Sequence, residues 1–115
     1  MFSKFEILRD LAILRLVLDT SRVKNRALLA HLKPGSIECQ AALRTGRGLI
    51  DCSMEHERLS ALNEGASQSP EMNSALLALH AESGALFVEI EFLFDELKAK
   101  RLPLPTPLHR YLRAA

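Results

Sequence analysis

Apolar residues recur along the first third of the chain at alternating spacings of four and three, which indicates one face of a long α-helix. This stripe consists of Ile7, Leu11, Leu14, Leu18, Ser21, Asn25, Leu28 and Leu32. Ser3 followed by Glu6 is a capping box at the start of the pattern, and Pro34-Gly35 ends it. The sequence therefore predicts a first helix over about residues 3–33.

Residues 72–97 carry a second stripe, mainly apolar, with the same alternating spacing of four and three. Its members are Met72, Leu76, Leu79, Ser83, Leu86, Ile90, Leu93 and Leu97. Ser69-Pro70-Glu71 is a start signal, because serine caps a helix and proline lacks the N–H that a first turn leaves unpaired. This pattern predicts a helix over about residues 69–101.

In the middle of the chain, a weaker pattern predicts a helix over about residues 36–64, with Ser36 as its cap. We expect its buried stripe to be Cys39, Leu43, Gly46, Ile50, Met54, Glu57 and Ala61. Gly46 and Gly48 each cost about 1 kcal/mol relative to alanine inside a helix, so a break near residues 44–48 stays open. Together the patterns predict an all-α fold, an antiparallel bundle of three long helices that forms one domain over residues 1–101.

Prolines occupy every second position in the segment Leu102-Pro103-Leu104-Pro105-Thr106-Pro107. Proline has no backbone donor and favours extended structure, so this segment cannot continue the helix. We predict an extended, Pro-rich C-terminal tail over residues 102–115, in which residues 108–113 can form one terminal helical turn.

Small and polar residues interrupt all three predicted stripes at a similar height. Folding the first two helices about Pro34-Gly35 sets Ser21 level with Gly48, and folding the third back sets Ser83 level with Leu49 and Ile50. The predicted mid-bundle layer consists of Ser21, Asn25, Gly46, Gly48 and Ser83. Such a layer can fix helix register and allow close packing, or it can form a small polar pocket for a ligand or a partner's side chain.

The first and third helices also carry apolar residues on the faces opposite their main stripes. A three-helix bundle needs only one buried face on each helix, so second apolar faces indicate a second contact surface. We predict partner-binding residues at Phe5, Leu16, Val23, Leu77, Val88 and Phe92. They serve either a homodimer or the capture of a partner helix. The alternative is that a twisted bundle and its tail cover both faces.

The formal net charge of +1 hides a segregated charge distribution. Residues 1–35 carry +4, residues 36–69 carry −2, residues 70–101 carry −3 and residues 102–115 carry +2. Oppositely charged helices attract one another in a bundle, which is our interpretation of this pattern. The basic run Arg22-Val23-Lys24-Asn25-Arg26 leaves a nucleic-acid-binding regulator as the alternative function. The near-neutral total and the length of the helices disfavour it.

The sequence contains no motif that predicts an enzyme, a metal site or a cofactor. His56 lies between two glutamates, but the zinc-protease pattern needs a second histidine where Ser60 stands. The Glu-x-x-His motif of di-iron bundles is absent as well. We expect all four histidines at the surface or at helix caps, at positions His31, His56, His80 and His109.

Two cysteines, Cys39 and Cys52, are too far apart on one helix to form a disulfide, so we expect reduced, packed thiols. The chain begins without a signal-peptide pattern and has no uncharged apolar stretch of about 18 residues. We therefore expect a cytoplasmic protein with no membrane span. Its predicted function is that of a non-enzymatic interaction module: an adaptor, a chaperone, or an assembly or regulatory factor.

Overall fold

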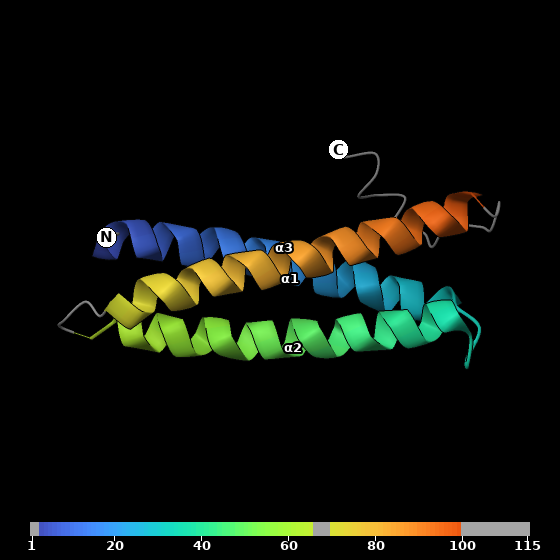
Figure 1. The fold of residues 1–115 in the computed structure, drawn as a ribbon, viewed down its shortest axis with the longest axis horizontal. Coiled ribbons are helices and arrows are strands. Elements are labelled where there is room, and N and C mark those ends of the chain that lie inside the picture. Colours follow the sequence, from blue (N-terminus) through green and yellow to red (C-terminus); the bar gives the residue numbers. More distant parts are fainter. Residues whose placement is uncertain (1–2, 66–69, 100–115) are drawn as a thin grey trace.

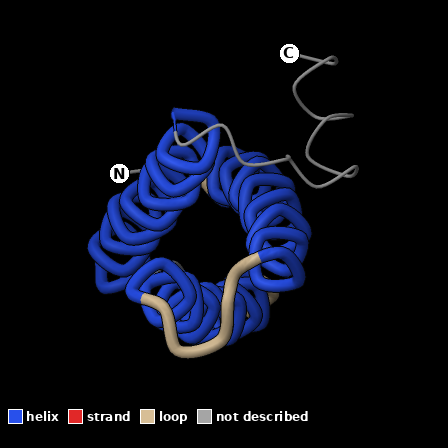
Figure 2. The backbone as a smooth tube through the Cα atoms, turned by 90° about the vertical axis from the view of Figure 1, so that its right-hand side faces the viewer, coloured by secondary structure: helices blue, strands red, loops and turns tan. Residues whose placement is uncertain are grey.

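The computed structural model describes residues 3–65 and 70–99, which form three α-helices. These are α1 (Lys4–His31), α2 (Ile37–Asn63) and α3 (Pro70–Ala99). Figure 1 shows that α2 runs antiparallel to both α1 and α3. Each helix contacts the other two, and Figure 2 shows them arranged around a common axis. The predicted antiparallel bundle of three long helices is confirmed.

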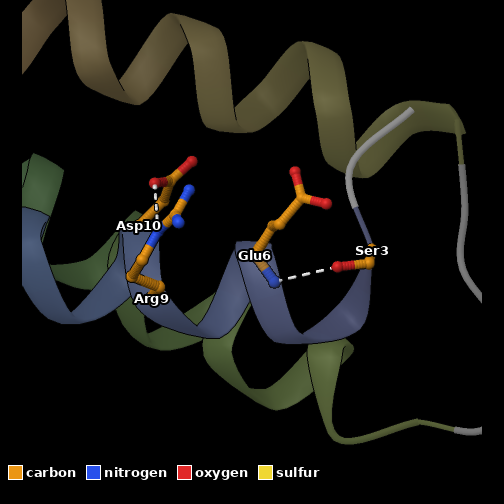
Figure 3. A network of polar contacts seen from close by, with 4 residues as sticks. All are labelled: Ser3, Glu6, Arg9 and Asp10. Carbon is orange, nitrogen blue, oxygen red and sulfur yellow. Dashed lines mark hydrogen bonds and ion pairs between the residues drawn. The ribbon is translucent and has the colours of Figure 1, made fainter.

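α1 and α2 begin at the residues that capping chemistry predicted. Ser3 Oγ accepts a hydrogen bond from the Glu6 backbone N–H at 3.1 Å (Figure 3). Ser36 Oγ accepts one from the Cys39 N–H, also at 3.1 Å. In the turn between α1 and α2, Gly35 adopts a φ of 82°, which residues with a side chain rarely adopt. Serine caps and one glycine turn therefore determine where α1 ends and α2 begins.

Some predictions fall on residues that the structure does not describe. The Pro-rich tail predicted over residues 102–115, the predicted cap Ser69 and residues 66–68 lie outside the described residues. Within the described residues, no helix combines the length and the hydropathy that crossing a bilayer requires.

The stripes predicted for α1 and α3 are their buried faces. Every member of the α1 stripe is buried, including the polar side chains of Ser21 and Asn25. The α3 stripe is buried as well, except that Leu86 is half-buried, and Phe94 joins it in the core. Full burial of one leucine or isoleucine contributes about 1.5–3 kcal/mol, so these two stripes supply most of the core.

The stripe predicted for α2 is wrong beyond Cys39. The buried face consists of Cys39, Ala42, Thr45, Leu49, Cys52, His56, Leu59 and Asn63. Leu43, Ile50 and Met54, which we expected in the core, are 49%, 52% and 64% exposed. The true stripe contains three polar side chains, and apolar residues occupy neighbouring exposed positions, so hydrophobicity alone indicates the wrong face. α2 runs unbroken through Gly46 and Gly48.

Adjacent residues of α2 provide a direct test of this face. We expect Leu49→Ala to lower the free energy of unfolding by about 2–5 kcal/mol, because it removes a fully buried side chain. Ile50→Ala should change it by less than about 1 kcal/mol, because Ile50 is half exposed. Urea unfolding followed by circular dichroism measures both values. The opposite ranking would restore the stripe predicted from the sequence.

Candidate functional site

The structure buries Ser21, Asn25 and Ser83 of the predicted mid-bundle layer, and Asn25 forms a hydrogen bond between α1 and α2. Asn25 is buried, and its Nδ2 donates to the Ala42 carbonyl at 3.0 Å. A Cβ on Gly46 would lie only 3.1 Å from that nitrogen. Glycine at position 46 therefore leaves room for the Asn25 side chain against α2.

Gly48 has a similar role between α2 and α3. A Cβ at this position would approach Leu86 Cδ2 to 2.9 Å, so the glycine lets the Leu86 side chain pack directly on the α2 backbone. Thr45 lies one turn away, with Oγ1 3.0 Å from both the Ala41 carbonyl and Glu89 Oε2. Gly46 therefore allows close packing of α2 against α1, and Gly48 allows close packing of α2 against α3.

The layer also contains polar atoms without partners. Ser21 Oγ and Asn25 Oδ1 are buried, and neither has a hydrogen-bond partner within residues 3–65 and 70–99. A buried polar atom left unpaired costs about 1–3 kcal/mol. The layer therefore lowers stability, which is typical of polar residues that specify helix register.

Ser21 allows this destabilisation to be measured. We expect Ser21→Ala to raise the free energy of unfolding by about 1 kcal/mol, because it removes an unpaired oxygen and alanine favours the helix. The urea midpoint of the variant measures the change. A less stable variant would mean that the hydroxyl makes a stabilising interaction.

Cys52 lies next to the layer and has the chemistry of a packed thiol. Its Sγ donates to Glu82 Oε2 at 3.7 Å. Burial raises the pKa of the thiol, the Ser83 hydroxyl offsets part of this effect, and the charges of Glu82 and Asp51 raise the pKa further. A raised pKa keeps the sulfur protonated at neutral pH, so Cys52 is a poor nucleophile.

The raised pKa of Cys52 predicts how stability changes with pH. The folded protein holds the thiol proton more tightly than the unfolded chain does. The stabilisation that results from this tighter binding is complete below the ordinary thiol pKa of 9.0. It is lost as the pH rises from 9.0 through the pKa of the folded state. We expect the stability advantage of wild type over Cys52→Ala to shrink between about pH 7 and pH 10. Urea unfolding of both proteins measures it, and a constant difference would contradict the raised pKa.

His56 corrects the prediction that the histidines lie at the surface or at caps. It is buried in α2, and its Nε2 lies 2.6 Å from the Leu11 carbonyl of α1. With the proton on Nε2, the ring donates a hydrogen bond across the helix interface. His31 is exposed at the end of α1, as expected, and His80 is half-buried. The three-four spacing from Leu49 through Cys52 to His56 is the signal that could have indicated its burial.

The basic run of α1 is divided between two sides of the helix. Lys24 faces α3, where its Nζ lies 2.8 Å from Glu91 Oε1 and 5.3 Å from the centre of the Phe87 ring. Arg22 and Arg26 instead line a groove between α1 and α2. The run therefore does not form one continuous basic surface.

The predicted partner-binding residues are all exposed in the single chain. Their exposed fractions range from 43% at Val23 to 74% at Phe5, and the others are Leu16, Leu77, Val88 and Phe92. Because the buried faces of α1 and α3 converge on one core, their opposite faces point outward in different directions (Figure 2). The six residues are thus divided between two surfaces, one on each helix.

Two open grooves between the helices were not predicted by the sequence patterns. One lies between α2 and α3 and has a volume of about 830 Å³. Its lining combines apolar residues, including Val88 and Phe92, with charged residues, including Arg44 and Glu89. The other lies between α1 and α2 and has a volume of about 290 Å³. The lining of each groove depends on which face of α2 points outward. Because the buried face predicted for α2 was wrong, the grooves could not be predicted.

Neither a metal site nor a relative points to a particular chemistry. Within the described residues, no three His, Cys, Asp or Glu side chains are grouped so that they could hold a metal ion. Comparisons of the chain with protein-family models, curated proteins and solved structures find no significant match.

Proposed function

We propose that the protein is a non-enzymatic interaction module that self-associates through the outer face of α3. One observation carries this proposal: most of this face is uncharged and apolar or small. Its uncharged exposed residues are Ser74, Leu77, Ala78, Ala81, Gly84, Ala85, Val88 and Phe92, and Glu82, Glu89 and Asp95 are the carboxylates exposed nearby on the same helix. A soluble monomer rarely exposes a continuous apolar strip of this length.

The spacing of the strip suits a second copy of the same helix. Leu77, Ala81, Gly84 and Val88 are separated by four, three and four residues, which is coiled-coil spacing. In an antiparallel pair with its two-fold axis near residues 82–83, Leu77 packs against Val88 of the other copy, and Ala81 packs against Gly84. One strip then covers itself, as symmetric dimers require.

Gly84 supports a contact of this kind. A Cβ built on Gly84 would meet no atom within 4 Å, so nothing in the described chain requires glycine there. A small residue at the centre of the strip lets a second helix approach closely. Val88 and Phe92 also line the groove between α2 and α3, so a helix laid along α3 can bury part of that groove too.

A nucleic-acid-binding regulator is less well supported, because Lys24 pairs with Glu91 and the basic run of α1 is divided. Phe5, Leu16 and Val23 on α1 remain predicted contacts for a further partner.

We also propose a cytoplasmic location for this adaptor-like, chaperone-like or assembly role. Cys39 and Cys52 are buried and form no disulfide, which suits a reducing compartment.

Two matched substitutions test the proposal. We expect wild type to have twice the mass of one chain in multi-angle light scattering, and Val88→Glu to have the mass of a monomer, because it places a charge in the dimer interface. Leu16→Glu on α1 is the control, since Leu16 and Val88 are similarly exposed and neither change disturbs the core. A monomeric wild type would exclude self-association, and disruption by Leu16→Glu alone would place the interface on α1.

A cysteine pair tests the antiparallel register. In the double variant Leu77→Cys with Val88→Cys, mild oxidation should link two chains through residues 77 and 88 of opposite copies. Peptide mapping of the linked dimer identifies the bond. Linkage of 77 to 77 and of 88 to 88 would contradict the antiparallel arrangement.

A further inference from the structure

The groove between α1 and α2 has a chemistry that the proposed dimer does not use. Three arginines line it: Arg22 and Arg26 from α1 and Arg47 from α2. Its remaining lining residues are apolar or uncharged, and none of them is a carboxylate. The groove is therefore cationic, although the whole chain is nearly neutral.

These arginines lack the carboxylate partners that three other arginines of α1 and α2 have. Arg9 pairs with Asp10, Arg15 with Asp19, and Arg58 with Glu55. No ion pair involves an arginine of the groove within the described ranges 3–65 and 70–99. Arg22 also lines a neighbouring pocket that contains Asp19 and Glu57, whereas Arg26 and Arg47 line only the groove among the pockets described.

Between the arginines, the groove offers exposed hydrocarbon. Leu43 and Ile50 are about half exposed, and Leu29 is half-buried beside them. A ligand that complements these residues carries carboxylates and apolar side chains on one face.

The length of the groove corresponds to a short helical segment. The lining residues run from Arg22 to Leu29 on α1 and from Leu43 to Ile50 on α2. Each stretch rises about 10 Å, or two helical turns. An amphipathic helix places anchors at this spacing when it binds in a groove between helices.

We propose that the α1/α2 groove binds an acidic amphipathic helix of another protein. Its carboxylates pair with Arg22, Arg26 and Arg47, and the planar guanidinium groups can hold each carboxylate through two hydrogen bonds. Its apolar side chains contact Leu43 and Ile50. The groove has no aromatic side chain on which a nucleic-acid base could stack, so the chemistry favours a peptide over a single-stranded nucleic acid.

Peptide titration of the full-length chain tests the proposal. The probe is a fluorescent helical peptide of about 14 residues, or four turns, with glutamate and leucine on one face. A counterpart with lysine in place of glutamate is the charge control. We expect the glutamate peptide to bind in fluorescence anisotropy, to weaken as salt rises, and to bind far more tightly than the lysine peptide.

Two double variants locate the binding site. Arg26→Glu with Arg47→Glu should weaken binding of the glutamate peptide by about tenfold or more, because it reverses two charges of the groove. Arg9→Glu with Arg58→Glu makes the same change in net charge outside the groove and should weaken it by less than about threefold. Ile50→Asn, at an exposed position, should also weaken binding, because the peptide loses an apolar contact.

Each remaining outcome supports or overturns the proposal. Equal losses in both double variants would indicate non-specific attraction, and no binding of the glutamate peptide would exclude the site. Binding of phosphatidylglycerol vesicles or of a DNA oligonucleotide in place of the peptide would also overturn it. Val88→Glu should bind the peptide as wild type does, so the groove is tested independently of the proposed dimer.

Discussion

The position of α2 relative to α1 is the constraint on which the rest of the structure depends. The bond from Asn25 to the Ala42 carbonyl, with Gly46 beside it, fixes how the two helices lie together in height and in rotation. His56 repeats this constraint nearer the other end of α2 through the Leu11 carbonyl. Because both are buried polar contacts, a rotation of α2 would leave their groups unpaired. The observed orientation of α2 places Leu43 and Ile50 outside the core, where they line the α1/α2 groove.

The sequence predicted the fold and much of the mid-bundle layer because strong local signals agreed. In α1 and α3 the apolar stripe, the cap and the turn residues all indicate the same helix, so Ser21, Asn25 and Ser83 could be placed by their spacing alone. In α2 the stripe failed because Thr45, His56 and Asn63 are buried through polar contacts or neighbouring packing, and hydropathy counts them against burial. The grooves could not be predicted, because each is a property of two helices and not of one.

Charge in this bundle serves two different purposes. Lys24 is largely buried between Glu91 and the Phe87 ring, so its charge contributes to the contact between α1 and α3. Arg22 and Arg26 face α2, and within the described residues neither forms an ion pair with a carboxylate. Helical periodicity separates them from Lys24, since residues two apart in a helix point in different directions. Segment charge alone suggested complementarity between helices, and it does not distinguish an internal ion pair from a cationic groove.

The two proposed contact surfaces do not compete with each other. In a three-helix bundle the groove between two helices lies across the core from the third, so the α1/α2 groove faces away from the outer strip of α3. A second copy packed on Leu77 and Val88 therefore leaves Arg22 and Arg47 accessible in both copies. Two such grooves on one dimer would bind a partner with two acidic helices more tightly than either groove alone, because the second contact forms within the complex. In these two proposals, the uncharged strip serves association and the cationic groove serves recognition.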